Sequence, residues 1–474
     1  MAASSSPDVW AGRRVLVAGA GISGQAMVTA LRSVGAEVQV ADDADNDNTA
    51  TLESQGVRVL RGLVVPPDGT DLIATSPGFR PSTPLMVSAV QRGIPVVGEP
   101  ELAWRLRGPA AAPWLALTGT DGKTTTVAML AAILSTAGLR TVAAGNIGLP
   151  LVSLVTGEET YDVLAVELSS AQLYWSQTIH PTVGTLINIA PDHLDWTGGF
   201  EAYIDTKVKI WDADVGVANL DDEVTRARFA DARPGRKVGF RLGEPALGEL
   251  GVVDGVLVDR AFGPDGASAD GSEQLAETSV LPPGEFNIAN ALAAAAMARG
   301  YGVEPRAIAT GLAAFRPEPH RNEVVAELDG VTYVNNSKAT SPHAAGAALS
   351  VYPSVVWVAG GLNKGLGFDE LVQGAAPKLR AVVLLGSCQD EIAEALARHA
   401  PDKPVVRVRR TDDGAMVEAV RAAARLAQPG DSVLLAPAAA SMDMFRNYNH
   451  RGEAFSDAVR SLVGSGGEQG AGRA

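Results

Sequence analysis

The segment from Trp114 to Thr125 has the sequence WLALTGTDGKTT, and it decides the predicted fold of the chain. Its apolar first four residues predict a buried strand, and the residues that follow Thr124 predict a helix. The glycine- and threonine-rich turn between them resembles a phosphate-binding loop, in which Lys123 would reach the β- and γ-phosphates and the Thr124 hydroxyl would bind Mg²⁺. The general pattern has a glycine where Leu117 stands, so the segment departs from it by one residue. The segment predicts a binding site for a nucleoside triphosphate.

Two later strands are predicted to end near this loop. Asp162–Val166 is followed by Glu167, and a carboxylate at such a position can face the magnesium ion of a phosphate-binding loop. Val183–Ile189 is a further apolar run, and His193 follows it in a short acidic turn. Taken alone, Glu167 could also cap a helix or lie on the surface, and His193 could hydrogen-bond to loop backbone. Their predicted positions make both of them candidate site residues.

Another glycine turn lies near the start of the chain. Arg14–Ala18 predicts a strand, Gly19–Gly24 has the pattern G-x-G-x-x-G, and the residues up to Arg32 predict a helix. A further strand, Val38–Ala41, ends at Asp42, where an acidic residue commonly meets a ribose hydroxyl. Backbone N–H groups at a helix N-terminus bind phosphates whatever molecule carries them. The pattern therefore predicts a phosphate-binding domain and leaves three possibilities open: NAD, another diphosphate ligand such as a nucleotide sugar, or a tight turn without a ligand.

The composition is that of a globular protein with several domains. The chain has 474 residues, and its 39 Lys and Arg against 54 Asp and Glu give a net charge of −15. That charge argues against non-specific binding to nucleic acid or to anionic membranes. No apolar stretch approaches the ~18–20 residues that span a bilayer, so we expect no membrane insertion. Cys388 is the single cysteine, which excludes an intrachain disulfide and fits a reducing cytoplasm.

Short runs of Val, Ile and Leu alternate with Ala-rich helical stretches, which predicts an α/β fold with mostly parallel sheets. Two proline-containing segments, Gly108–Pro113 and Arg316–Pro319, are candidate linkers. An acidic region from Leu242 to Ser279 contains Val252–Val258, which looks like a hairpin with an Asp-Gly turn. We expect three domains and a flexible Gly-rich tail, at residues 1–108, 109–317, 318–463 and 464–474.

Taken together, the motifs resemble those of the Mur ligase family, the ATP-dependent enzymes that build the stem peptide of peptidoglycan. The resemblance spans nearly the whole chain, and its segments follow in the family's order. They are Thr118–Thr124, Gly145–Gly148, Glu167–Leu173, Asp192–Asp195, Gly284–Asn290 and His320–Arg321. The resemblance implies a Rossmann-like nucleotide-sugar domain, a central P-loop ATPase domain with a mostly parallel sheet, and a C-terminal Rossmann-like α/β domain that binds the amino acid. It also implies that the first glycine turn holds the diphosphate of UDP and not NAD.

Three segments of the third predicted domain resemble the family members that add D-glutamate to UDP-N-acetylmuramoyl-L-alanine. They are Asn336–Thr340, Gly360–Gly365 and Ala440–Phe445. The resemblance implies a cytoplasmic ligase that acts through an acyl phosphate, and we expect a monomer. The alternatives are a Mur-type ligase that adds a different amino acid, a nicotinamide oxidoreductase fused to a P-loop module, and a nucleotide-sugar binding protein without activity.

The resemblance implies ATP and two Mg²⁺ ions as cofactors, and it assigns a role to each residue that matches a family motif. The catalytic residues would be Lys123, Glu167, His193 and Lys207, and the metal ligands would be Thr124, Glu167, His193 and Lys207. ATP would be bound by Gly119, Thr120, Asp121, Gly122, Lys123, Thr124, Thr125, Asn287, Asn290, Arg321 and Asn336. The UDP-sugar substrate would be bound by Gly21, Ile22, Ser23, Asp42, Asp43, Ser76, Pro77, Gly78, Asn146, Ser169 and Gln172. D-glutamate would be bound by Lys338, Thr340, Lys364, Ser441 and Tyr448.

Lys207 requires a modification to serve as a metal ligand, because an ammonium group cannot ligate a cation. In the family the matching lysine is carbamylated by CO₂, and the resemblance implies the same for Lys207. Lys209, two residues later, is expected on the wrong face of the same helix. Without the resemblance, Lys207 would be interpreted as a solvated surface lysine.

Three positions depart from the family pattern. Asn336 stands where Asp is usual, and Phe286 and Ser341 stand where His and Asn are frequent. Asn can still hydrogen-bond to a ribose but carries no charge. The departures bear on nucleotide affinity more than on the class of reaction.

Overall fold

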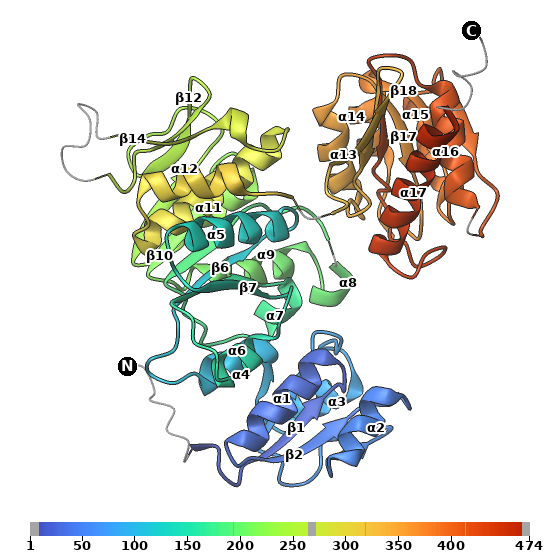
Figure 1. Cartoon of the computed structure of the whole chain (residues 1–474). Coiled ribbons are helices and arrows are strands. Elements are labelled where there is room, and N and C mark those ends of the chain that lie inside the picture. The colour runs from blue at the N-terminus through green and yellow to red at the C-terminus, as the bar shows by residue number, and fades with distance from the viewer. Residues whose placement is uncertain are drawn as a thin grey trace. The chain divides into compact units, whose positions relative to one another are not determined.

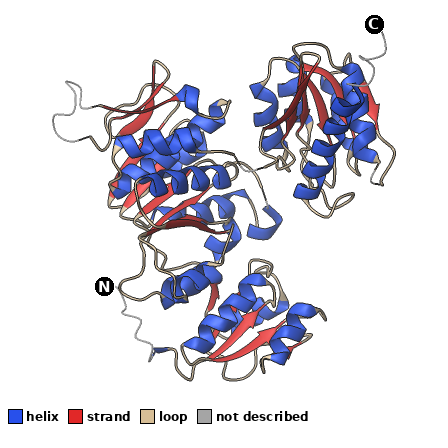
Figure 2. Cartoon of the chain, viewed as in Figure 1, coloured by secondary structure: helices blue, strands red, loops and turns tan. Residues whose placement is uncertain are grey.

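The structure is a computed structural model that describes residues 9–192, 194–263, 272–317, 319–363, 365–412 and 414–466 (Figure 1). The chain divides into two units, Met1–Leu281 with Asn287–Phe315, and Pro282–Phe286 with Arg316–Ala474. In each unit the strands are flanked by helices (Figure 2), which is the predicted α/β class. None of the described helices is long and apolar enough to cross a membrane.

The first unit begins with a five-stranded parallel sheet in the order β3-β2-β1-β4-β5. Its strands are β1 (Arg14–Ala18), β2 (Glu37–Ala41), β3 (Arg58–Leu60), β4 (Leu72–Thr75) and β5 (Val96–Gly98). Its helices are α1 (Ile22–Ser33), α2 (Asp47–Ser54), α3 (Pro84–Gln91) and α4 (Glu99–Leu106). The strand order reverses between β1 and β4, so the turns that follow these two strands lie at the switch point where open α/β sheets bind ligands.

The same unit contains a nine-stranded sheet in the order β14-β13-β12-β11-β10-β9-β6-β8-β7. Pairing is parallel from β7 to β12 and antiparallel from β12 to β14. The strands are β6 (Trp114–Thr118), β7 (Thr141–Gly145), β8 (Val163–Glu167), β9 (Val183–Leu186), β10 (Val215–Asn219), β11 (Arg236–Phe240), β12 (Glu249–Val253), β13 (Val256–Asp259) and β14 (Glu273–Glu277). The helices are α5 (Lys123–Thr136), α6 (Leu151–Thr156), α7 (Ser170–Tyr174), α8 (Leu194–Thr197), α9 (Phe200–Val208), α10 (Glu223–Asp231), α11 (Glu285–Tyr301) and α12 (Pro305–Ala314), with 3₁₀ turns η2 (Lys209–Trp211) and η3 (Thr278–Val280).

Strand β6 is buried on both faces, which explains why it is apolar at every early position. Leu115 and Leu117 pack among residues of α5, α11 and α12. Trp114 and Ala116 belong to a cluster that contains residues of α9 and of the first sheet. Side chains alternate across a strand, so a strand covered on both faces needs a continuous apolar run. The glycine loop after β6 therefore starts from a rigid, buried strand.

The predicted Asp-Gly hairpin is confirmed. Asp254 and Gly255 connect β12 to the antiparallel β13, and both adopt positive φ, at 49° and 76°. Positive φ at both central residues is what a type I′ turn requires, and Asp-Gly supplies it at low cost. Arg299 of α11 ties the end of this hairpin to the core, because its Nε donates to Asp259 Oδ2 at 2.7 Å.

The second unit contains a six-stranded sheet in the order β15-β16-β20-β17-β18-β19, parallel except between β15 and β16. The strands are β15 (Glu323–Leu328), β16 (Val331–Asn335), β17 (Val355–Ala359), β18 (Leu379–Leu384), β19 (Val405–Arg407) and β20 (Ser432–Leu435). The helices are α13 (Pro342–Val351), α14 (Asp369–Ala375), α15 (Gln389–His399), α16 (Ala415–Leu426) and α17 (Tyr448–Gly466), with the 3₁₀ turn η4 (Ala376–Lys378). Helix α17 continues three residues past the expected domain end at Val463, and residues 467–474 of the expected tail lie outside the described residues.

Candidate functional site

The loop between β6 and α5 is shaped by its glycines and by an asparagine that follows β9. Gly122 has φ +82°, and a Cβ there would lie 2.5 Å from Asn290 Oδ1 of α11, so only glycine fits. Asn188 accepts hydrogen bonds from the backbone N–H groups of Thr120 and Asp121 through Oδ1, both at 2.9 Å. Its Nδ2 donates to Asp121 O at 2.9 Å. Asn188 therefore fixes the loop from both sides.

Two lysines from different helices converge on one carbonyl of this loop. Lys123 Nζ donates to Gly119 O at 2.9 Å and to Thr120 O at 2.7 Å. Lys207 Nζ, from α9, donates to Gly119 O at 2.7 Å and to Thr118 Oγ1 at 3.3 Å. The interpretation of Lys207 as a solvated surface lysine is wrong, because the residue is 1% exposed.

The surroundings of Lys207 disfavour its charged form. Burial lowers the pKa of Lys207 well below its ordinary value, and the neighbouring Lys123 lowers it further, whereas Asp192, Asp121 and Glu167 act in the opposite direction. Removal from water penalises an ammonium group more than its neutral amine. The surroundings therefore weaken the charge of Lys207 beside the loop between β6 and α5.

Lys209 lies in a different environment, as the sequence suggested, although it belongs to η2 and not to the helix of Lys207. Its Nζ donates to the carbonyl oxygens of Leu173, Tyr174 and Ser176 at 3.1–3.3 Å. These carbonyls lie at the end of α7, where a cation is favourable. Lys209 therefore stabilises a helix end.

Glu167 is held at the end of β8 with one carboxylate oxygen paired and the other unpaired. Asn146 Nδ2 donates to Glu167 Oε1 at 2.9 Å, and Asn146 N donates to Glu167 O at 2.8 Å. Glu167 Oε2 is buried and has no hydrogen-bond partner among the described residues. A buried, unpaired carboxylate oxygen is costly unless a cation or donor meets it there. This oxygen is therefore free to ligate a metal ion.

Several predicted residues can be placed around this centre. Thr124 and Thr125 lie in the first turn of α5, and Asn290 Oδ1 accepts from Thr126 Oγ1 at 3.1 Å, so Asn290 contacts the start of α5. Asn287 lies one turn earlier in α11 and is buried. His193 lies outside the described residues. Within the described part of the chain, no group of three or more His, Cys, Asp or Glu side chains could hold a metal ion.

Ser169 and Gln172 form a local structure with each other. Ser169 Oγ accepts from Gln172 N at 3.2 Å, and Gln172 Oε1 accepts from Ser169 N at 2.9 Å. This reciprocal capping box starts α7 directly after Glu167 and Leu168. Their expected role in substrate binding stays a prediction.

The sequence analysis did not identify two residues that contact the loop between β6 and α5. Asn188 is described above, and Tyr203 of α9 places its hydroxyl 3.1 Å from Thr120 Oγ1. Burial raises the pKa of Tyr203, so it stays a neutral hydroxyl. A polar residue at a strand end was a signal for Asn188, but no local pattern pointed to Tyr203.

The glycine turn of the first sheet lies between β1 and α1 as predicted. Gly19 has φ +104°, and a Cβ there would lie 2.4 Å from Ser76 Oγ, so this turn and the Ser76–Gly78 turn after β4 are adjacent. Asp42 accepts from Ala20 N at 2.7 Å through Oδ2 and from Ala44 N at 2.9 Å through Oδ1. Asp42 therefore supports the turn's backbone.

The remaining predicted residues of this region surround the same switch point. Asp43 Oδ1 accepts from Gly62 N at 2.6 Å. Gly21 is the N-cap of α1, and Ile22 and Ser23 occupy its first turn. Ile22 is 79% exposed, so an apolar side chain stands at the mouth of the turn.

In the second unit, residues that follow two neighbouring strands carry the predicted amino-acid site. Lys338 Nζ lies 3.9 Å from the centroid of the Tyr448 ring. Thr340 N donates to Lys338 O at 2.8 Å. Ser441, which is buried, follows β20, and the predicted ATP contact Asn336 directly follows β16. Lys364 lies outside the described residues.

Arg451 of α17, which the sequence analysis missed, joins the loops of this region. Its guanidinium donates to Ser337 Oγ at 3.1 Å, to Ser337 O at 2.9 Å and to Ala439 O at 3.1 Å. A longer bond of 3.4 Å reaches Gly360 O. Burial lowers the pKa of Arg451 to about 10, and the acceptors in these four contacts are all neutral. The cation therefore holds three strand ends together through neutral acceptors.

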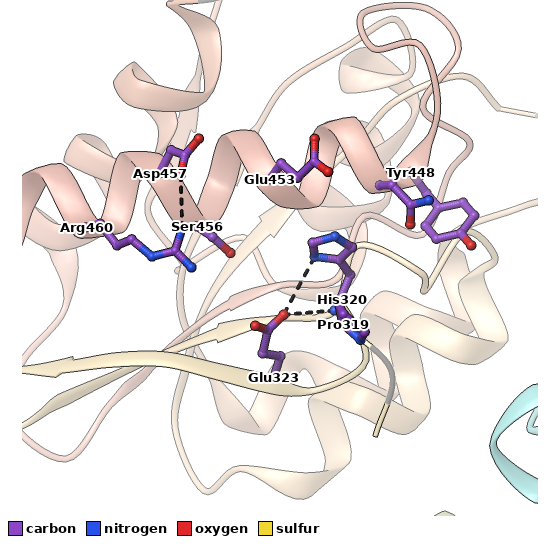
Figure 3. Close-up of a pocket in the computed structure, with 9 residues that line it drawn as sticks. Pro319, His320, Glu323, Tyr448, Glu453, Ser456, Asp457 and Arg460 are labelled. Carbon is purple, nitrogen blue, oxygen red and sulfur yellow. Dashed lines mark hydrogen bonds and ion pairs between the residues drawn. The ribbon is translucent and has the colours of Figure 1, made fainter. Parts of the chain in front are cut away.

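A hollow of about 720 Å³ lies beside this region, between His320, Glu323 and helix α17 (Figure 3). His320 has φ +65°, and its N–H donates to Glu323 Oε2 at 2.9 Å. Asn335 Nδ2 lies 2.9 Å from His320 Nδ1 and donates to Gly452 O at 2.9 Å. These contacts fix the imidazole at the start of the unit, directly before the predicted nucleotide contact Arg321.

Three stretches of the sequence match known families in chain order. Residues 13–98 match the family described as Mur ligase MurD-like, N-terminal domain. Residues 117–298 match the Mur ligase middle domain, and residues 320–439 match the Mur ligase, glutamate ligase domain.

Curated relatives are similar over nearly their full length. The UDP-N-acetylmuramoylalanine--D-glutamate ligase of Streptomyces avermitilis is 55% identical over 464 residues, which cover 96% of this chain and 99% of that protein. The protein of the same name from Streptomyces coelicolor is 53% identical over 470 residues, with 96% and 99% covered. Among solved structures, the UDP-N-acetylmuramate-alanine ligase of Thermotoga maritima superposes with a TM-score of 0.55 at 20% identity, covering 95% of this chain and 99% of that one. The last similarity shows the fold alone.

Proposed function

The chain belongs to the Mur ligase family, and from this premise we propose that it is an ATP-dependent ligase that adds D-glutamate to UDP-N-acetylmuramoyl-L-alanine in peptidoglycan synthesis. The observation that carries the proposal is the convergence of Lys123 and Lys207 on Gly119 O, beside a carboxylate with one unpaired oxygen. Such a cluster suits the transfer of a phosphoryl group between anions.

The reaction requires activation of the carboxylate. The L-alanine carboxylate attacks the γ-phosphorus of ATP, the bond to the β-phosphate oxygen breaks, and ADP leaves. The amine of D-glutamate then attacks the acyl carbon, loses a proton and expels phosphate. On binding ATP, Lys123 would give up its hydrogen bonds to the carbonyls of Gly119 and Thr120 and donate to phosphate oxygens instead. Its charge would then stabilise the transferred group.

The donor set beside the loop fits a magnesium ion. The Thr124 hydroxyl and Glu167 Oε2 are oxygen donors of the kind that Mg²⁺ prefers. An ion bound there would neutralise the charge of the β- and γ-phosphates. We assign a second ion to Lys207, in carbamylated form, and to His193.

Carbamylation of Lys207 is favoured by its surroundings. A carbamate forms when a neutral amine adds to CO₂ and loses a proton. The lowered pKa of Lys207 supports a neutral amine, and burial beside Lys123 offers a positive partner for the carbamate. Burial also lowers the pKa of Lys209, but its Nζ donates to three carbonyls near the end of α7, and the neighbouring charge that acts on its pKa is the carboxylate of Glu101 and not a lysine.

D-glutamate would bind in the second unit. Lys338 and Lys364 supply positive charge for a dicarboxylate, and Thr340, Ser441 and Tyr448 supply hydroxyls. We further propose that the protein acts as a monomer in the cytoplasm, where both ATP and the UDP-sugar are available.

The test is phosphate release from ATP in the presence of UDP-N-acetylmuramoyl-L-alanine and a panel of amino acids of both hands. We expect release with D-glutamate and little with the others. Release with another amino acid alone would favour the alternative Mur-type ligase. Binding of NADH in preference to the UDP-sugar would favour the oxidoreductase.

A further inference from the structure

Helix α4 connects the first sheet of the first unit to the second sheet, and it carries two buried carboxylates. Glu99 is 2% exposed and Glu101 is 0% exposed. They are two positions apart, so they project from the helix about 200° apart and reach different segments. Trp104 of the same helix packs edge-to-face against Trp114 of β6, with ring centroids 4.9 Å apart.

Glu99 binds the start of α6. Its Oε1 accepts from Val152 N at 2.6 Å, and the backbone N–H of Leu151 also donates to the Glu99 carboxylate. Helix α6 follows directly after residues 145–150, the loop in which Asn146 pairs with both the backbone and the carboxylate of Glu167. Asn146, near the start of this loop, orients Glu167. Glu99 therefore holds the end of the loop that leads into α6.

Glu101 binds the segment that follows α7. Its Oε2 accepts from Gln177 N at 2.9 Å and from Thr178 N at 3.0 Å, and its Oε1 accepts from Thr178 Oγ1 at 2.7 Å. Helix α7 begins three residues after Glu167. The two carboxylates thus hold the two segments that lead away from β7 and β8.

A third contact joins the same parts. Gly98, the last residue of β5, donates from its N–H to Trp175 O at 3.1 Å. A Cβ at Gly98 would lie 3.3 Å from Trp175 Cβ, so the approach is close. Strand β5 and helix α4 are therefore joined at three points to the segments that follow β7 and β8.

We propose that α4 is a brace, by which we mean a helix that fixes the segments after β7 and β8 relative to the first sheet. Glu99 and Glu101 are then positioning residues, which hold Asn146 and Glu167 in place. The expected effect on turnover rests on the proposed function, whereas the expected effect on the structure does not. Burial raises the pKa of Glu99 to about 7, so the carboxylate is kept in place against a cost of desolvation.

Hydrogen exchange tests the structural part. Glu99→Ala should raise the exchange rates of the Leu151 and Val152 amides about tenfold or more, since a buried hydrogen bond is lost. Glu99→Gln keeps a carbonyl acceptor and should restore most of the protection. Glu101→Ala should instead raise exchange at Gln177 and Thr178. Glu158→Ala, at an exposed position after α6, is the matched control and should change neither segment.

Kinetics test the positioning part. Glu99→Ala should lower kcat about 10- to 100-fold, because Glu167 is displaced, and should raise KM for the UDP-sugar, because the predicted substrate contact Asn146 lies on the same loop. KM for D-glutamate, whose predicted contacts lie in the second unit, should stay nearly unchanged. Unchanged exchange at Leu151 and Val152 in the Ala variant would overturn the brace, and loosened amides with an unchanged kcat would overturn the positioning role. A wild-type protein that ligates nothing would contradict the proposed function, whereas the exchange rates would still decide whether α4 braces the loop.

Discussion

Two glycine turns in the first unit share a strand–turn–helix plan and differ in the side chains that surround them. Gly19, at φ +104°, and Gly122, at φ +82°, both use a conformation that favours glycine. In the first turn, the backbone N–H of Ala20 donates to the Asp42 carboxylate. Around the second, two lysines meet the carbonyl of Gly119. The comparison teaches that the two turns share a backbone pattern that indicates a phosphate, whereas the side chains around them, Asp42 at one and the lysines of α5 and α9 at the other, distinguish their chemistry.

The largest effect is expected at the lysine that only the second turn has. Lys123→Ala should lower kcat by about 10²–10³-fold or more, because it removes the charge that meets the transferred phosphoryl group. Steady-state phosphate release measures it, and binding of the UDP-sugar, whose predicted contacts do not include Lys123, is the check on folding. A variant with near-normal kcat would contradict the assignment of the second turn as the ATP site.

The next effect separates Lys207 from Lys209. Lys207→Ala should abolish most turnover, and added formate or acetate should restore part of it by supplying a carboxylate in the vacated position. Lys209→Ala should keep turnover and lose about 1 kcal/mol of stability, because it removes hydrogen bonds to α7. An active Lys207→Ala variant, or an inactive Lys209→Ala variant, would show that the wrong lysine has been assigned.

A pair of glycine substitutions tests the comparison directly. Gly19→Ala should raise KM for the UDP-sugar about tenfold with little change in KM for ATP, since alanine is strained at positive φ by about 1–2 kcal/mol. Gly122→Ala should do the reverse, because its Cβ would also meet Asn290 Oδ1 at 2.5 Å. Equal effects of both variants on both substrates would mean that the two turns do not serve separate ligands.

The local parts of this site could be predicted from the sequence, and the long-range parts could not. The phosphate loop and the Asp-Gly hairpin are short patterns whose residues act on their own backbone. Ser169 and Gln172 also had a local signature, because Ser-x-x-Gln is a capping-box spacing. Asn188 and Arg451 act on loops far away in the chain, and no spacing within their own segments indicates that.

The last effect concerns stability alone, through its pH dependence at α4. Burial raises the pKa of Glu99 from 4.5 to about 7, so the folded state binds its proton more tightly than the unfolded chain does. Its contribution to stability is therefore greatest below pH 4.5 and is lost as pH rises through about 7. Glu99→Gln should become more favourable relative to wild type between pH 5 and pH 8, by on the order of 2–3 kcal/mol.

Glu101 is the control, because its pKa is shifted in the opposite direction from that of Glu99. Burial acts to raise the pKa of Glu101, but hydrogen bonds from Thr178 and Gln177 and the charge of Arg105 outweigh it, and the pKa is lowered. Its contribution is present at neutral pH and is lost as pH falls through the lowered pKa. Urea unfolding of Glu99→Gln and Glu101→Gln at several pH values measures both, and parallel pH profiles for the two variants would contradict the assignment.

The central claim, ligation through an acyl phosphate, is tested most directly by following oxygen. UDP-N-acetylmuramoyl-L-alanine labelled with ¹⁸O in its carboxylate is incubated with ATP, Mg²⁺ and D-glutamate, and the inorganic phosphate is analysed by mass. The account predicts one ¹⁸O atom in phosphate for each amide formed, because a carboxylate oxygen leaves with the γ-phosphoryl group. Unlabelled phosphate, or label found in AMP, would contradict it.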